Sequence, residues 1–421
     1  MHRPYIVWDE IATALPAAQA DILIQLATTA LTYDATLYIV GGAARSVFQQ
    51  QPITDLDIAI SRTSSEIVTA LATAIGGHVT HHDQFATATI HLPQAHALPS
   101  IDVVPTRQEQ YAHPGALPTV TPADIETDLA RRDISVNAIA IAVVPYGHCP
   151  VYDPFNGIGD LRRRVARVLH AASFVDDPTR IIRMARMAVR LNLRVSRQSL
   201  AAIERAHQSQ AMQHVSQHRW IQELTKTMAE PDPGRVVARL QRWRVLATIH
   251  PALRMVRTMQ YSLAHIPHEM RLAGLLWHAT HANLMHCIQT WHELPVSYRQ
   301  IPTLKQVVAT WRRRRVTRPS YIATLLRPFA PTLCASMAML DPTLAQMQTI
   351  WQHAVQHTPP VLITGTDLLA TGLTPGPHIG HYLNQLRDAL LDGHIDAATQ
   401  AVQLSWTLAN PPTSQLHRQL L

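Results

Sequence analysis

The 421-residue chain is poor in cysteine and in aromatic residues, and it has no long apolar run. Its three cysteines, Cys149, Cys287 and Cys334, lie too far apart for a zinc motif, and an odd number of them is typical of a reducing compartment. Aromatic residues make up 5% of the chain, which argues against base stacking as the main way of holding a single strand. No segment approaches the ~20 apolar residues of a membrane helix, and the N-terminal residues contain no signal-peptide core. We therefore expect a cytoplasmic protein that does not contact a membrane.

Arginine is what the chain has in excess. Lysine and arginine number 36 against 29 acidic residues, which gives a net charge of +7 and a pI near 9.6. Because arginine suits two-point contact with phosphate, this charge is compatible with a nucleic-acid partner. The densest clusters are Arg162–Arg164 and Arg312–Arg315, and each is equally compatible with a solvated face. A chain of this length is expected to form about two to four domains.

The strongest local signal is a strand–turn–strand pattern near the N-terminus. An apolar run ends in Gly41-Gly42, Arg45 follows, and Asp55 and Asp57 come soon after. Residues two apart in a strand share a face, so the two carboxylates would point the same way and repel each other without a cation between them. Mg²⁺ prefers such oxygen ligands. The glycines let backbone N–H groups approach a phosphate, and the arginine can bind one. The pattern therefore predicts a site for a nucleoside triphosphate and its metal.

Neither half of this pattern is specific when taken alone. A Gly-Gly turn is common, and an Asp-x-Asp pair at a strand end is often a solvated edge. The strand-like run 101–104 adds Asp102, a candidate third acid at the metal site, although an aspartate at a strand end ahead of Pro105 can also be merely solvated. The order of further blocks along the chain makes the functional reading much stronger.

Six blocks follow one another in a recognisable order: GGAAR (41–45), TDLDI (54–58), DLARRDISVNAIA (128–140), VYDPFNGIGDL (151–161), DDPTRIIRMARMAVRL (176–191) and VSQHRWIQELTK (215–226). In this order they resemble the class II tRNA nucleotidyltransferase/poly(A) polymerase family, within the polymerase-β-like nucleotidyltransferases. The stretch ITGTDLLATGLTPGPHIG (363–380) resembles the tail of the tRNA enzymes. Six ordered blocks are far more specific than any one of them.

The resemblance implies a template-independent enzyme that adds CCA, or part of it, to tRNA 3′ ends from CTP and ATP, with Mg²⁺ as cofactor and release of pyrophosphate. The implied partners are tRNA and the two nucleotides. Catalytic roles are implied for Asp55, Asp57 and Asp102, of which Asp55 and Asp57 would bind the metal. Nucleotide contacts are implied for Gly41, Gly42, Arg45, Arg132, Asp133, Asn137, Asp177, Arg180, Arg183 and Arg186.

Two of the blocks also have a purely local interpretation. Asp133 and Asn137 are four residues apart and would share a helical face, or the first could be an N-cap with the second solvated. Asp177-Pro178 is a good helix start, so the arginines that follow could be only a charged helix face. Functionally, Asp177 would accept from the exocyclic amine that C and A share, and Arg180 would donate to the acceptor beside it.

The chain departs from the family pattern at two positions. Ser46 replaces the usual aspartate, which puts the usual orientation of Arg45 in doubt, and Asp176 replaces the usual glutamate. The alternatives to a tRNA enzyme are a poly(A) polymerase of the same family and a catalytically silent RNA-binding relative. The blocks do not distinguish addition of CCA, CC or A alone, and they leave the oligomeric state open.

Periodicity and the resemblance together predict an α+β protein: a polymerase-β-like nucleotidyltransferase head, then all-helical neck, body and tail domains. The expected divisions are residues 1–150 for the head, 151–214 for the neck with base recognition, 215–300 for the body and 301–421 for a tRNA-binding tail. Strand signals nearly vanish after Asp153. The segment Gln110–Asp124, rich in proline, is expected to be a flexible loop beside the active face.

Overall fold

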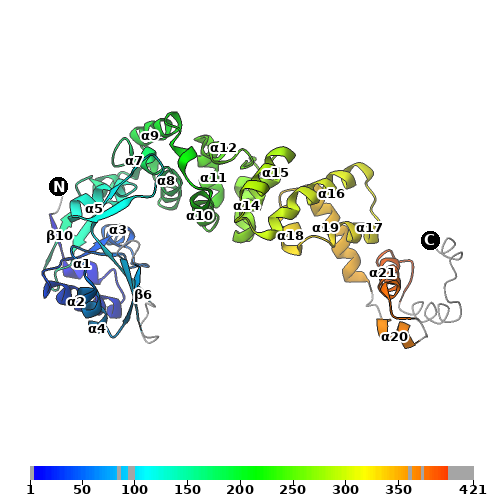
Figure 1. Cartoon of the computed structure of the whole chain (residues 1–421), viewed down its shortest axis with the longest axis horizontal. Helices are drawn as coiled ribbons and strands as arrows, with labels where there is room; N and C mark the ends of the chain where they lie inside the picture. Colours follow the sequence, from blue (N-terminus) through cyan, green and yellow to red (C-terminus); the bar gives the residue numbers. More distant parts are fainter. Residues whose placement is uncertain (1–3, 83–86, 93–99, 359–362, 371–373, 397–421) are drawn as a thin grey trace. The chain divides into compact units, whose positions relative to one another are not determined.

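The computed structural model describes residues 4–82, 87–92, 100–358, 363–370 and 374–396 (Figure 1). The chain divides into two compact units, Met1–Ile249 and His250–Leu421. The N-terminal unit contains a mixed sheet followed by helices, and the described part of the C-terminal unit is helical, as the sequence predicts. The finer division into four domains stays a prediction. Among the described residues, no helix has the length and apolar character needed to cross a membrane.

The N-terminal unit is built on an eight-stranded sheet with the order β1-β10-β9-β2-β3-β6-β5-β4. Neighbouring strands are antiparallel except β3 and β6, which are parallel. The strands are β1 (Tyr5–Val7), β2 (Leu37–Val40), β3 (Ile58–Ile60), β4 (His78–His82), β5 (Thr87–His91), β6 (Ser100–Pro105), β9 (Ala140–Ala142) and β10 (His148–Tyr152).

Each face of this sheet is covered by its own core. The larger core joins the sheet to α1 (Trp8–Ala12), α2 (Ala17–Leu31), α3 (Gly41–Gln49) and α4 (Ser65–Ala74). The smaller core lies against α5 (Ile125–Ala130). Within β2, Leu37 and Ile39 face the larger core, whereas Tyr38 and Val40 face the smaller one. The two-residue period of a strand therefore places successive side chains on opposite faces of the sheet.

The remaining elements of the N-terminal unit are short strands, turns and helices. They include the hairpin β7 (Arg107–Gln110) and β8 (Thr119–Pro122), the 3₁₀ turn η2 (Ser135–Asn137), and a short parallel pair β11 (Val165–Ala166) and β12 (Arg194–Val195). The helices among them are α6 (Gly157–Arg162), α7 (Ser173–Asp176), α8 (Thr179–Arg190), α9 (Arg197–Gln208), α10 (Gln217–Met228), α11 (Pro233–Arg242) and α12 (Val245–Ile249), with η3 (Ala211–His214) between α9 and α10.

The C-terminal unit packs helices around buried Tyr298 and Trp311. The hydroxyl of Tyr298 donates to the Glu269 carbonyl oxygen at 2.5 Å, and the Trp311 indole donates to the Val316 carbonyl at 2.6 Å. The helices are α13 (Met259–Ser262), η4 (Leu263–His265), α14 (His268–Trp277), α15 (His281–Thr290), η5 (Val296–Gln300), α16 (Ile301–Arg314), α17 (Pro319–Leu326), α18 (Pro331–Ala338), α19 (Pro342–His357), α20 (Gly365–Ala370) and α21 (Pro377–Leu391).

Three local expectations from the sequence are wrong. Asp55 and Asp57 precede strand β3, which begins at Ile58, so they are not within the strand. The segment Gln110–Asp124 is not simply a loop, because its flanks pair as the hairpin β7–β8. The block that follows α5 does not continue as an α-helix: it forms only the 3₁₀ turn η2, since Ser135 N–H is bonded to the Arg167 carbonyl outside the turn.

Candidate active site

A cavity of about 480 Å³ opens on the sheet face that carries the smaller core. Its wall combines the β2–α3 junction, β3, β6, β7, α5 with η2, and the start of α8. Most of the residues singled out from the sequence line it: Gly41, Gly42, Asp57, Asp102, Arg132, Asp133, Asn137, Asp177, Arg180 and Arg183. Asp55, Arg45 and Arg186 are not part of this lining. Segments far apart in the sequence therefore meet around one hollow.

Two carboxylates of the cavity wall come from neighbouring segments: Asp57 directly precedes β3, and Asp102 lies within β6. Ile58 of β3 is opposite Val103 of β6, and both side chains belong to the larger core. Asp57 and Asp102 are each one residue earlier, so the two-residue period turns both toward the cavity. Asp102 also accepts a hydrogen bond from Thr89 Oγ1 at 2.8 Å. The register of β3 and β6 thus explains how two aspartates distant in the sequence come to share the cavity.

The negative charge of Asp57 is only partly compensated. Burial raises its pKa, and the neighbouring Asp55 raises it further, whereas the backbone N–H of Gly42 and the guanidinium of Arg132 lower it. Among the described residues, no three His, Cys, Asp or Glu side chains are grouped tightly enough to hold a metal ion by themselves. The available donors are all carboxylate oxygens with excess negative charge, and this chemistry fits a hard divalent cation.

The glycine pair forms the first turn of α3 directly beside Asp57. Gly41 has φ of +61°, and a Cβ there would lie 3.2 Å from Asp57 Oδ2, so a side chain would be both strained and crowded. Arg45, one turn further along, donates to Asn137 Oδ1. Its Nε is buried and has no hydrogen-bond partner among the described residues. Burial, with nearby Arg190, lowers the pKa of Arg45. A buried donor without an acceptor beside a glycine turn is suited to an anionic group.

The arginine pair at the end of α5 is held by a single buried carboxylate. Asp128 is fully buried and bonds to Arg131 at 2.6 Å and Arg132 at 2.9 Å. Burial alone would raise the pKa of Asp128, but Arg132 and Arg131 together hold it below its usual value. Arg132 also reaches Gly41, since its Nη1 lies 3.4 Å from the position that a Cβ would take on that glycine. Asp128 therefore fixes an arginine at the same place where the glycine turn approaches the cavity.

The block 151–161 acts as a structural support for this corner. Asp153 accepts hydrogen bonds from the Gly157 and Ile158 N–H groups, which begin α6. Asp160, fully buried, accepts from Ser135 Oγ at 2.7 Å and from Arg167 at 2.8 Å. Because Ser135 begins the turn that carries Asn137, this joint positions the partner of Arg45. The block thus acts through support rather than by lining the cavity.

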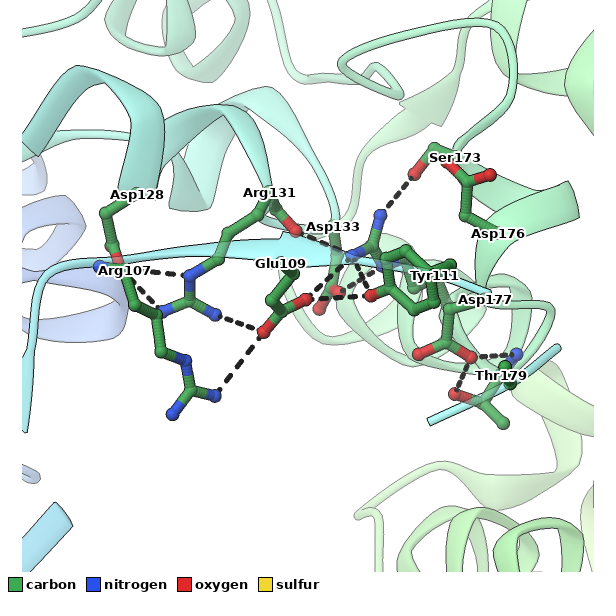
Figure 2. A network of polar contacts seen from close by, with 12 residues as sticks. Arg107, Glu109, Tyr111, Asp128, Arg131, Asp133, Ser173, Asp176, Asp177 and Thr179 are labelled. Carbon is green, nitrogen blue, oxygen red and sulfur yellow. Dashed lines mark hydrogen bonds and ion pairs between the residues drawn. The ribbon is translucent and has the colours of Figure 1, made fainter. Parts of the chain in front are cut away.

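The cavity wall also contains Arg180 of α8 and Asp177, which lies two residues before that helix begins. Figure 2 shows Asp177 beside Thr179. Asp177 Oδ1 accepts from Thr179 N at 3.0 Å and from Thr179 Oγ1 at 2.6 Å, so it does fasten the helix start, as its local interpretation predicts. It also accepts from Arg219 Nη2 at 2.8 Å. Arg180 is buried, with 3% of its surface exposed, and Ser173 Oγ accepts from its Nη1 at 3.0 Å.

The later arginines of α8 have different partners. Arg183 bonds to Asp133 at 2.7 Å, and this carboxylate raises the pKa of Arg183. Arg186 instead pairs with Glu223 at 3.1 Å and Glu230 at 2.8 Å, on α10 and the turn that follows it. Arg183 therefore stays at the cavity, whereas Arg186 fastens α8 to its neighbouring helices.

Sequence reasoning missed three lining residues on and just after one strand, Arg107, Glu109 and Tyr111. Glu109 lies between Arg131, at 2.9 Å, and the hydroxyl of Tyr111, at 2.7 Å (Figure 2). Arg107 Nε is buried and has no hydrogen-bond partner among the described residues. The signal was the i, i+2, i+4 spacing of three polar side chains, which a strand places on one face. This spacing was overlooked because the segment leads directly into the stretch from Gln110 that the sequence predicts to be a loop.

Residues 37–167 match the family described as the poly A polymerase head domain. Over 222 residues the chain is 38% identical to the A-adding tRNA nucleotidyltransferase of Halalkalibacterium halodurans, a match that covers 52% of this chain and 51% of that protein. Over 226 residues it is 34% identical to the CC-adding tRNA nucleotidyltransferase of Deinococcus radiodurans, covering 54% and 58%. The matches thus span about half the length of these curated relatives.

The fold is similar to that of solved CCA-adding enzymes. An apo form of a CCA-adding enzyme matches with a TM-score of 0.80 at 22% identity, covering 96% of this chain and 100% of that one. The Thermotoga maritima CCA-adding enzyme complexed with tRNA matches with a TM-score of 0.75, also at 22% identity, covering 97% of this chain and 100% of that one. At this identity the likeness is one of fold. The resemblance to the class II nucleotidyltransferases expected from the six blocks is confirmed.

Proposed function

We propose that this chain, which carries a head domain of the poly(A) polymerase family, is a template-independent nucleotidyltransferase that adds CCA or part of it to tRNA 3′ ends from CTP and ATP. The observation that carries the proposal is the single cavity described above. Its lining brings together two carboxylates, a glycine turn with an arginine, and an Asp–Arg pair able to read a base. These are the groups that a metal, a triphosphate and a base would each need.

The triphosphate would bind at the glycine turn. Gly41 and Gly42 keep this corner free of side chains, and the buried Nε of Arg45 offers a donor without an acceptor. Arg132, held by Asp128, brings a second guanidinium to the same corner. Asn137 holds Arg45 in this chain, so the serine at position 46 does not leave that arginine without orientation. Fixed donors of this kind stabilise charge that develops on a transferring phosphoryl group.

Asp57 and Asp55, with Asp102, would hold the divalent metal, for which we propose Mg²⁺. When bound, such an ion activates the attacking 3′ oxygen and neutralises the leaving pyrophosphate. Burial, and to a lesser extent the charge of Asp55, raises the pKa of Asp57. A cation beside Asp57 would therefore offset both the desolvation of its charged form and its repulsion by Asp55. Asp102 is aligned toward the same space by the β3–β6 register and by Thr89.

Base selection would fall to Asp177 and Arg180. A carboxylate accepts from an exocyclic amine, and a guanidinium donates to a ring acceptor, which together favour C and A over U and G. Asp133, paired with Arg183, and Asn137 line the same cavity and would contact the sugar. The roles of these residues, the cytoplasmic location and binding of tRNA by the C-terminal unit are parts of the same proposal.

The test is a primer-extension assay with purified protein. The tRNA substrates end before CCA, after the first C or after CC, and the nucleotides are CTP, ATP or both, with product length as the readout. We expect extension that stops at or before the complete CCA end and is lost in Asp57→Asn. The lengths reached with each primer decide between addition of CCA, CC and A alone. Long A tracts on an unstructured RNA would instead indicate a poly(A) polymerase, and the absence of any extension would contradict the proposal.

A further inference from the structure

The guanidinium of Arg180 is held on several sides by residues from outside its helix. Its Nη2 donates to the Tyr111 hydroxyl at 2.9 Å and to the Arg131 carbonyl at 2.7 Å, and it lies 3.5 Å from Glu109 Oε2. Its Nη1 donates to Ser173 Oγ at 3.0 Å. These partners come from β7 and the residues after it, from the end of α5 and from α7, so several elements together fix one side chain.

Two hydrogen-bond donors of Arg180 remain for a substrate. An arginine has five N–H donors, and the contacts above use both hydrogens of Nη2 and one of Nη1. The Nε of Arg180 lies 3.7 Å from Asp133 Oδ1, which is too far for a hydrogen bond. The second hydrogen of Nη1 and the hydrogen of Nε are therefore left without a hydrogen-bond acceptor among the described residues.

The contacts around Tyr111 have a fixed direction. Burial raises the pKa of Tyr111 well above its usual value, so the phenol keeps its proton. That proton points to Glu109 Oε2 at 2.7 Å, which leaves a lone pair of the phenol oxygen to accept from Arg180. The Arg180 guanidinium carbon also lies 5.8 Å from the centre of the Tyr111 ring, within cation–π range.

Glu109 is itself fixed, which makes it a stable anchor for this chain of contacts. Its Oε1 lies 2.9 Å from Arg131 Nη1 and 3.4 Å from Arg107 Nη2, and only 8% of its side chain is exposed. Arg131 in turn is bonded to buried Asp128 (Figure 2). The contacts therefore form a chain that runs from α5 to Glu109, then to Tyr111 and on to Arg180. The orientation of this arginine side chain on α8 thus depends on strand β7 and the residue that follows it.

We propose that Glu109 and Tyr111 are positioning residues that hold Arg180 in the orientation needed to read the base of the incoming nucleotide. The proposal rests on the function proposed above. Neither residue need touch the base, because their effect passes through the guanidinium. Without them Arg180 keeps its charge but gains rotational freedom, and a donor that can rotate discriminates poorly between acceptors and amines. The chemical class affected is therefore the nucleobase, not the triphosphate.

The test compares Tyr111→Phe and Glu109→Gln with Gln108→Ala, a matched control on the same strand whose side chain is exposed on the opposite face. For each protein, kcat/KM is measured for CTP, ATP, UTP and GTP on tRNA primers, and thermal unfolding is recorded. We expect Tyr111→Phe to reduce the preference for CTP over UTP about tenfold, the loss of about 1.4 kcal/mol of discrimination. Glu109→Gln should have a smaller effect in the same direction, and the control should retain the wild-type preference.

An equal fall in rate for all four nucleotides, or an unchanged preference in both variants, would overturn the proposal and leave these residues a structural role. Equilibrium binding of CTP and of UTP to each protein separates this inference from the proposed function. If the wild type extends no tRNA but binds CTP more tightly than UTP, the proposed function fails, and loss of that difference in Tyr111→Phe still supports positioning. A wild type that binds both nucleotides equally overturns the inference.

Discussion

Removal of the Asp128 carboxylate should destabilise the N-terminal unit more than any other single acidic substitution in α5. Asp128 is fully buried and holds both Arg131 and Arg132, and it also accepts from the Arg107 N–H at 3.2 Å. Breaking a buried ion pair by removing one partner costs ~3–5 kcal/mol. The two arginine side chains are still 18% and 17% exposed, so they recover part of their hydration and the lower end applies.

For Asp128→Ala we therefore expect a loss of about 3 kcal/mol in the free energy of unfolding, which for a unit of this size is a fall of about 6–12 °C in Tm. Thermal and urea unfolding followed by circular dichroism would measure it. The matched control is Glu126→Ala, an exposed acid on the same helix, which should stay within about 0.5 kcal/mol of the wild type. A loss below about 1 kcal/mol for Asp128→Ala would refute the reasoning.

Asp128 should also affect how stability depends on pH and how well the protein binds nucleotides. The folded structure holds the pKa of Asp128 below its usual value. The stability that its charge contributes is therefore fully present at a pH above the usual pKa, and it is lost as the pH falls through the lowered pKa of the folded state. Wild-type stability should therefore fall in acid, and Asp128→Ala should fall less steeply. KM for nucleotides should rise in the variant, since Arg132 loses the partner that directs it toward Gly41.

Three further outcomes are expected. Gly157→Ala should prevent stable folding, because its Cβ would lie 2.1 Å from the backbone carbonyl oxygen of Ser135. The control Gly380→Ala has open space around the added Cβ and should unfold like the wild type, so similar stability for the two variants would contradict this expectation. Arg313 and Arg314 are exposed, so changing both to Gln should weaken tRNA binding without changing nucleotide binding. The slope of the logarithm of tRNA affinity against the logarithm of salt concentration should become shallower by about one for each phosphate that is no longer bound. An unchanged slope in filter-binding assays would show that the two arginines do not contact the RNA. Since the folded-state pKa of Asp57 is raised, metal-free protein should lose stability as the pH rises through it, and Asp57→Asn should abolish that loss; superimposable unfolding curves against pH would argue against it.

The parts of the site that the sequence alone predicted are those that depend on residues close together in the chain. Most of the residues that the ordered blocks singled out line the cavity, and the two-residue strand period accounts for Asp57 and Asp102 facing it together. Asp177 fastens the start of α8, as an Asp-Pro pair predicts. The helix start and the strand period depend on residues within a turn or a strand of one another, so the chain determines them wherever the segment lies.

The tertiary structure alone decided the partners of those polar groups that meet across distant parts of the sequence. Arg180 contacts Tyr111 and Glu109 from 69 and 71 residues away, and Arg45 meets Asn137 from 92 residues away. Asp128 pairs locally with Arg131 and Arg132, three and four residues further on, but the tertiary packing decided that it is buried, whereas the acid two residues before it is exposed. Composition and periodicity specify which side chains leave water, but the pairing of buried charges depends on how strand β7, α5 and α8 meet. That arrangement is set by the packing of the whole N-terminal unit, so local patterns do not contain it.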